Sequence, residues 1–176
     1  MKRFSFVPAL ILLPLLSCGE GDTARPGTSL VAHDAWVLSD PNTDPFVEFR
    51  EERIPCDPTS VAREDIAGFD SVEVKTGPCS YITLEQAMRS DLREGDQVEI
   101  RVWHYFLDEL YASEAHVVLQ TGDTVLWAEK ISLPTDGGIV KGIVTATEDV
   151  SADAPLYFHI RNHGRNSWHL LEVNRL

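Results

Sequence analysis

The chain has 176 residues, of which 43% are hydrophobic, and a formal net charge of −13 at pH 7. This length suits one ordinary domain with a substantial core. The negative charge disfavours binding to nucleic-acid phosphates and to anionic lipid head groups, because like charges repel. We therefore expect no nucleic-acid partner.

The first segment of the chain is typical of an export signal. Two basic residues precede an apolar run that extends from Phe4 to Leu16 and ends in Leu15-Leu16-Ser17-Cys18. The run is shorter than the roughly 20 apolar residues that a membrane-spanning helix needs. We therefore expect residues 1–17 to be a signal peptide that is removed.

The tetrapeptide Leu15-Leu16-Ser17-Cys18 resembles the lipobox of bacterial lipoproteins. In that family the cysteine is lipidated on sulfur, the preceding peptide is removed, and the new N-terminus is usually acylated. The resemblance implies that Cys18 carries a lipid such as palmitate and holds the protein at a membrane of the cell envelope. Gly19 follows the cysteine, which implies the outer membrane if the cell has one. The alternative is an ordinary secretory signal with a chance cysteine.

Two further cysteines, Cys56 and Cys79, form an even pair in an exported chain, where oxidising conditions favour a disulfide. The bridge would close a loop of about two dozen residues and contribute about 3 kcal/mol in the chain-entropy model. The alternatives are a buried thiol pair or half of a metal site. Neither cysteine lies in a CxxC spacing, which disfavours the metal site.

Residues 18–30 are polar and lack an apolar period, which is typical of a flexible tether. From Val31 onward, short apolar runs are separated by turn signals such as those around Gly95 and Gly122. This pattern predicts an all-β domain over residues 31–176, a single antiparallel β-sandwich of the jelly-roll or immunoglobulin-like type.

The clearest predicted strand runs from Val98 to Phe106. Its alternation puts one set of side chains on a core face, namely Val98, Ile100, Val102, His104 and Phe106. Similar patterns predict strands over 71–76, 114–120, 124–131, 138–146, 156–161 and 167–173. The only helix candidate is Leu84 to Arg89, because Thr83 and Gln86 have the spacing of a capping box.

Histidines gather in the second half of the chain, which raises the alternative of a histidine-dependent metal-binding domain or metalloenzyme. His159 and His163 would be roughly 13 Å apart in an extended strand. Ligands would therefore have to converge from different strands. The five histidines after residue 100 are His104, His116, His159, His163 and His169.

The segment from His159 to Trp168 is dense in hydrogen-bonding side chains and is flanked by predicted apolar strands. We expect Asn162 to Trp168 to form a hairpin turn that contributes the rim of a ligand site together with His104 or His116. Amide, imidazole and guanidinium groups suit hydroxyl-rich ligands, and Trp103, Tyr157 or Trp168 could supply walls for a sugar ring. The alternative is that these residues only build a turn. The candidate ligand-binding residues are His104, His116, His159, Asn162, His163, Arg165, Asn166 and Trp168.

The sequence has no GxSxG or HExxH motif, so we expect no catalytic residues and no cofactor. The layout of the domain resembles the β-sandwiches of carbohydrate-binding modules. We therefore predict a lipid-anchored, non-enzymatic envelope protein whose β-sandwich binds a glycan or another envelope protein.

Overall fold

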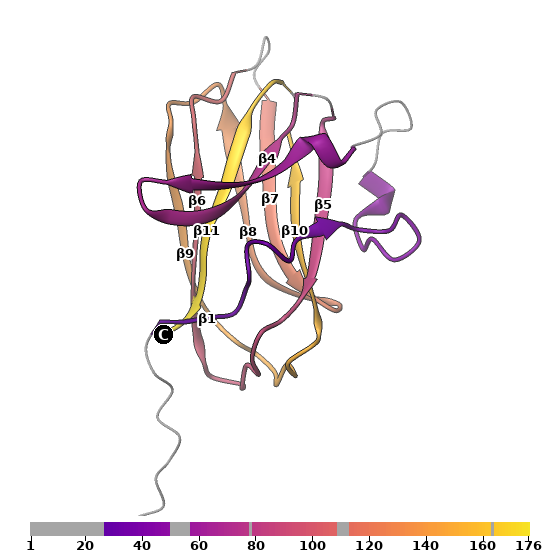
Figure 1. Cartoon of the computed structure of the whole chain (residues 1–176), viewed down its shortest axis with the longest axis vertical. Coiled ribbons are helices and arrows are strands. Elements are labelled where there is room, and N and C mark those ends of the chain that lie inside the picture. The colour runs from indigo at the N-terminus through magenta and orange to yellow at the C-terminus, as the bar shows by residue number, and fades with distance from the viewer. Residues whose placement is uncertain (1–26, 50–56, 78, 109–112, 163) are drawn as a thin grey trace, which may run out of the picture.

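The computed structural model describes residues 27–49, 57–77, 79–108, 113–162 and 164–176. In this part of the chain, antiparallel strands form two sheets, as predicted (Figure 1). The elements are β1 (Thr28–Ser29), β2 (Val37–Leu38), η1 (Val47–Phe49), η2 (Pro58–Ser60), β3 (Val61–Ile66), β4 (Phe69–Lys75), β5 (Tyr81–Ala87), β6 (Gln97–His104), β7 (Ser113–Thr121), β8 (Thr124–Leu133), β9 (Gly138–Thr145), β10 (Pro155–Arg161) and β11 (Ser167–Arg175).

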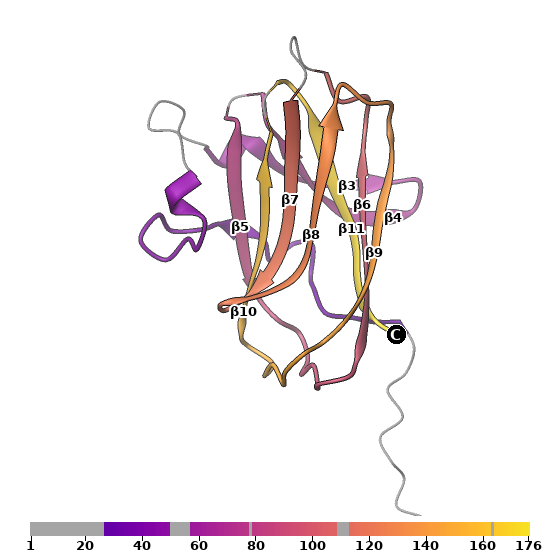
Figure 2. The same cartoon turned by 180° about the vertical axis from the view of Figure 1, so that it is seen from behind.

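The first sheet has the strand order β3-β4-β11-β6-β9, with β1 paired to β11, and the second has the order β2-β5-β10-β7-β8. Figure 2 shows β5, β10, β7 and β8 on one side of the molecule and β11, β6 and β9 on the other. Every strand pair of both sheets is antiparallel. The single β-sandwich predicted from the sequence is thus confirmed.

The core lies between the sheets and consists of the side chains that alternate inward from each strand. Val98, Ile100 and Val102 are fully buried, and His104 is 4% exposed, as the alternation predicts. Phe106 is 54% exposed, because β6 ends at His104 and the alternation ends with it.

Three other sequence predictions are wrong or shifted. The expected helix from Leu84 to Arg89 is instead strand β5 and the residues after it. The expected hairpin between β10 and β11 is a crossover, because these strands belong to different sheets. Part of the expected tether is folded, since β1 pairs with β11 and Leu30 is fully buried.

The predicted disulfide involves a residue outside the described part of the chain. Cys79 is 1% exposed, whereas Cys56 and the lipidation candidate Cys18 lie outside the described residues. Both assignments remain predictions. Within the described ranges, no helix has the length and apolar character that crossing a membrane requires.

A buried tryptophan lies at each of the two long edges of the sandwich. At the edge between β8 and β9, Trp127 is 5% exposed and packs against Gly142. At the opposite edge, Trp36 is 7% exposed and its ring lies 6.2 Å from that of Phe158. A Cβ at position 142 would overlap the Trp127 indole, so the close packing here requires glycine.

We therefore expect Gly142→Ala to lower the free energy of unfolding by about 1–3 kcal/mol, because the buried indole has to move. Gly138→Ala is the matched control in the same strand, since nothing lies within 4 Å of a Cβ built there. It should change the stability by less than about 0.5 kcal/mol. Urea denaturation of both variants measures the difference, and equal losses would contradict the proposed packing constraint.

Candidate functional site

The outer face of the second sheet carries polar and aromatic side chains in rows across four neighbouring strands. The rows follow from the antiparallel register, which places directly opposed residues on the same face. One row consists of Tyr81, Arg161, His116 and Lys130. The next row consists of Thr83, His159, Val118 and Ala128.

The segment after β2 folds across the middle of this face. The Phe46 ring stacks on His159 with centroids 4.2 Å apart and an interplanar angle of 13°. The Tyr81 hydroxyl donates a hydrogen bond to Asp44 Oδ2 at 2.6 Å, which ties the segment to β5. Phe46 belongs to a small buried cluster with Tyr81, Val118 and Tyr157. This central stack separates two hollows on the face.

His159 in the centre of the stack is 1% exposed. Burial lowers its pKa to about 3, and the nearby His116 and Arg161 act in the same direction. Its Nδ1 lies 3.0 Å from Thr83 Oγ1. The imidazole is therefore neutral at physiological pH and packs as an aromatic ring rather than as a cation.

We call the first hollow the cationic hollow. It has a volume of about 400 Å³ and is lined by Phe49, Ser113, Glu114, His116, Lys130 and Arg161. The guanidinium carbon of Arg161 lies 5.8 Å from the centre of the Phe49 ring. The pKa of His116 is lowered by its partial burial and further by the charges of Lys130 and Arg161.

We call the second hollow the acidic hollow. It has a volume of about 470 Å³ and is lined by Ala35, Val37, Thr43, Glu85, Gln86, Ala87, Asp153, Pro155 and Tyr157. Glu85 Oε2 accepts a hydrogen bond from Ser39 Oγ at 2.6 Å, which fixes this carboxylate at one wall. The hollow offers mainly hydrogen-bond acceptors next to the Tyr157 ring.

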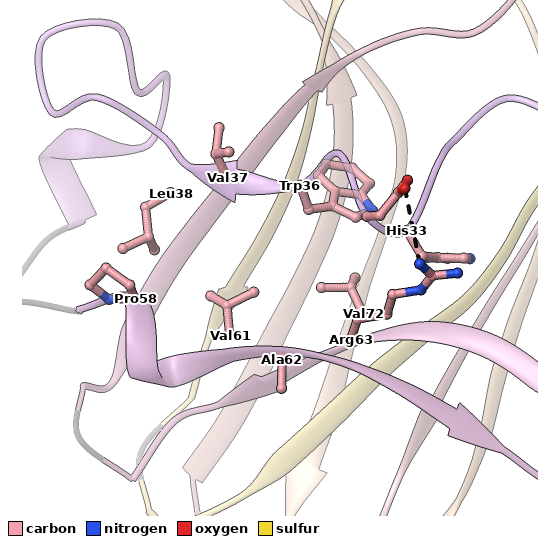
Figure 3. Close-up of a pocket in the computed structure, with 10 residues that line it drawn as sticks. His33, Trp36, Val37, Leu38, Pro58, Val61, Ala62, Arg63 and Val72 are labelled. Atoms are coloured by element: carbon pink, nitrogen blue, oxygen red, sulfur yellow. Dashed lines mark ion pairs between the residues drawn. The ribbon is translucent and has the colours of Figure 1, made fainter.

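A third cavity of about 450 Å³, the edge pocket, lies between β2 and β3 (Figure 3). Trp36, Leu38 and Val61 line its apolar part. Its charged rim is already compensated, because Arg63 donates two hydrogen bonds to Asp70 at 2.7 and 2.8 Å and lies 4.0 Å from Asp34. This pocket suits an apolar group better than a hydroxyl-rich ligand.

Five of the candidate ligand-binding residues have buried side chains. His104, His159, Asn162, Asn166 and Trp168 are at most 4% exposed. The His104 and Trp168 rings lie 5.1 Å apart at the end of the core. Such burial disfavours direct contact with a ligand.

Asn162 and Asn166 belong to a polar network that holds the crossover between the sheets. The Asn162 amide donates to Thr76 Oγ1 at 3.0 Å, and the Thr76 backbone N–H donates to the Asn166 carbonyl at 2.9 Å. Asn166 Oδ1 accepts from the Asp108 N–H at 2.9 Å, while its amide donates to the Asp108 carbonyl at 3.3 Å. The polar string predicted as a ligand rim is thus largely occupied by internal hydrogen bonds.

The remaining candidates lie in different places. His116 lines the cationic hollow, and Arg165 is exposed on the crossover. His163 lies outside the described residues. A ligand-binding role for these three residues stays a prediction.

The three expected aromatic walls do not form one site. Trp168 is in the core, Tyr157 is on the outer face of the second sheet, and Trp103 is on the first sheet, 4.8 Å from the His169 ring. Of the described histidines after residue 100, His104 and His169 lie on the first sheet and His116 and His159 on the second. Among the described residues, no group of three or more His, Cys, Asp or Glu side chains is placed to hold a metal ion.

Four residues of the candidate face, Phe46, Phe49, Lys130 and Arg161, were not among the residues predicted from the sequence. The alternation within the predicted strands 124–131 and 156–161 assigns Lys130 and Arg161 to a face of each strand. Only the pairing register of the strands shows that Lys130 and Arg161 lie on the same face of the sheet. Nothing in the loop sequence indicates that Phe46 folds over His159.

We expect Asn166→Ala to lower the free energy of unfolding by about 1–3 kcal/mol, because the Asp108 N–H and carbonyl lose their side-chain partner. Arg165→Ala is the control, because Arg165 precedes Asn166 in the chain and its side chain is exposed. This substitution should change the free energy of unfolding by less than about 0.5 kcal/mol. Chemical denaturation measures both. Equal stability of the two variants would show that the network does not stabilise the crossover.

No protein-family model and no curated protein sequence matches the chain. Among solved structures, it is similar to a carbohydrate-binding module, CBM28, described as specific for non-crystalline cellulose. The two share 12% identity over 88% of this chain and 94% of that one, with a TM-score of 0.52. A family 11 carbohydrate-binding module from Clostridium thermocellum, in complex with a β-1,3-1,4-mixed-linked tetrasaccharide, matches with 10% identity over 87% and 97% of the two chains and a TM-score of 0.46. At this identity, the likeness to CBM28 establishes the β-sandwich fold.

Proposed function

We propose that the chain is a non-enzymatic glycan-binding domain whose ligand lies on the outer face of the second sheet. The observation that carries the proposal is the pair of hollows on either side of the Phe46–His159 stack. Both combine an aromatic ring with charged groups, and the acidic hollow adds the Gln86 amide. A sugar ring has apolar C–H faces and polar edges, so it can use both kinds of contact.

The size of the hollows favours a glycan over a protein partner. Volumes of about 400 and 470 Å³ suit small, rigid rings that enter a concave surface. In the cationic hollow, Phe49 is 42% exposed, so part of its ring remains free for contact. The likeness of the fold to CBM28 supports the same function.

The test is a glycan-binding screen followed by affinity measurements on variants. Phe49→Ser should weaken binding about 3- to 10-fold, because it removes an aromatic surface from the hollow. Phe106→Ser is the matched control, since Phe106 is 54% exposed but follows β6 of the first sheet. Thermal melts verify that both variants remain folded. Failure of the wild type to bind any glycan, or equal effects of the two substitutions, would contradict the proposal.

We further propose that a lipid on Cys18 anchors the domain in the cell envelope, at the outer membrane if the cell has one. The lipobox-like tetrapeptide Leu15-Leu16-Ser17-Cys18 supports this location. Two or more acyl chains hold a protein durably at a bilayer, whereas one chain does so only marginally.

We expect Cys18→Ser to move the protein from the membrane fraction to the soluble fraction and to abolish incorporation of a labelled fatty acid. Cys56→Ser is the control for loss of a cysteine, because it leaves the lipobox-like tetrapeptide intact and should stay labelled. Unchanged labelling of Cys18→Ser would contradict the anchor.

A further inference from the structure

We propose that the cationic hollow recognises the carboxylate of an acidic sugar, so that the ligand is a glycan containing uronic acid. This inference rests on the proposed function and names the ligand class of the same face. It depends on the arrangement of Arg161, His116 and Lys130.

These three side chains form one row across adjacent strands. Arg161 of β10 is directly opposite His116 of β7, and His116 is directly opposite Lys130 of β8. Neighbouring strands are about 4.8 Å apart, so the Arg161 and Lys130 positions are separated by about 10 Å with His116 between them. This separation matches a short stretch of glycan lying across the strands.

The cations of the row are available for a ligand. Within the described part of the chain, Arg161 has no ion pair, and its guanidinium lies over the Phe49 ring. Lys130 is 3.9 Å from Glu114, but both side chains are well exposed, and such surface pairs are weak. The Arg161 guanidinium can therefore donate two parallel hydrogen bonds to the carboxylate of a ligand.

The local charge differs from that of the whole protein. The chain has a net charge of −13, whereas the cationic hollow has two cations and one anion, Glu114. The acidic hollow on the other side of the stack presents Glu85 and Asp153, which would repel a second carboxylate. The face therefore favours a glycan that places an acidic residue over Arg161 and Lys130 and neutral residues toward Tyr157.

The experiment compares two polyuronates, polygalacturonate and alginate, each in its free-acid and its esterified form, at 0.15 M salt. Esterification keeps the sugar backbone and removes the charge. We expect the wild type to bind a free-acid form at least about tenfold more tightly than its ester, since a charge-assisted contact is lost. The double variant Lys130→Gln/Arg161→Gln should bind the acid form at least about tenfold more weakly than the wild type.

Lys141→Gln is the matched control, because Lys141 is an exposed lysine on the outer face of the first sheet. It should bind like the wild type, and thermal melts verify that all variants are folded. The inference is overturned if the ester binds as well as the acid, if the double variant binds like Lys141→Gln, or if dextran sulfate binds as tightly as the polyuronates. Binding of neutral glucans but of neither polyuronate would also overturn it while leaving the proposed function intact. Failure to bind any glycan would overturn both.

Discussion

The antiparallel register of β5, β10, β7 and β8 is the constraint on which the core and the candidate site both depend. Leu84, Phe158 and Leu119 are opposed in one row and are fully buried between the sheets. The adjacent row on the outer face centres on His159, and Arg161 and His116 lie in the row beyond it. A shift by one residue would exchange the two faces of a strand. The burial of the aliphatic row therefore also fixes the positions of the polar groups on the surface.

The sequence predicted strands well where one side of the strand is apolar and the other polar. In β6, the buried residues Val98, Ile100 and Val102 alternate with charged or partly exposed ones, and this period is visible without a structure. In β5 the period is absent, because residues on both faces are covered. Thr83 and Gln86 resembled a helix cap, but Thr83 bonds to His159 and Gln86 accepts a hydrogen bond from the Ala32 N–H. Tertiary contacts thus overrode the local signal.

The candidate site was harder to predict because hydrogen-bonding side chains look alike in sequence whether they face a ligand or another segment. The partners of Asn162 and Asn166 are Thr76 and Asp108, which are 86 and 58 residues away along the chain. No local pattern reveals such pairings. The row of Arg161, His116 and Lys130 was difficult to predict for the same reason. Its members come from three strands, and only the pairing register brings them together.

The buried His159 also couples the centre of the candidate glycan face to acidity. The pKa of His159 is about 3 in the folded protein, whereas that of an unperturbed histidine is 6.5. At pH values between these two, the unfolded chain therefore binds one more proton than the folded one. The contribution of His159 to the free energy of unfolding is constant above pH 6.5. Between pH 6.5 and about 3, each unit by which the pH falls lowers the free energy of unfolding by about 1.4 kcal/mol. Acid therefore opposes the Phe46–His159 stack, whereas above pH 6.5 this histidine makes no pH-dependent contribution.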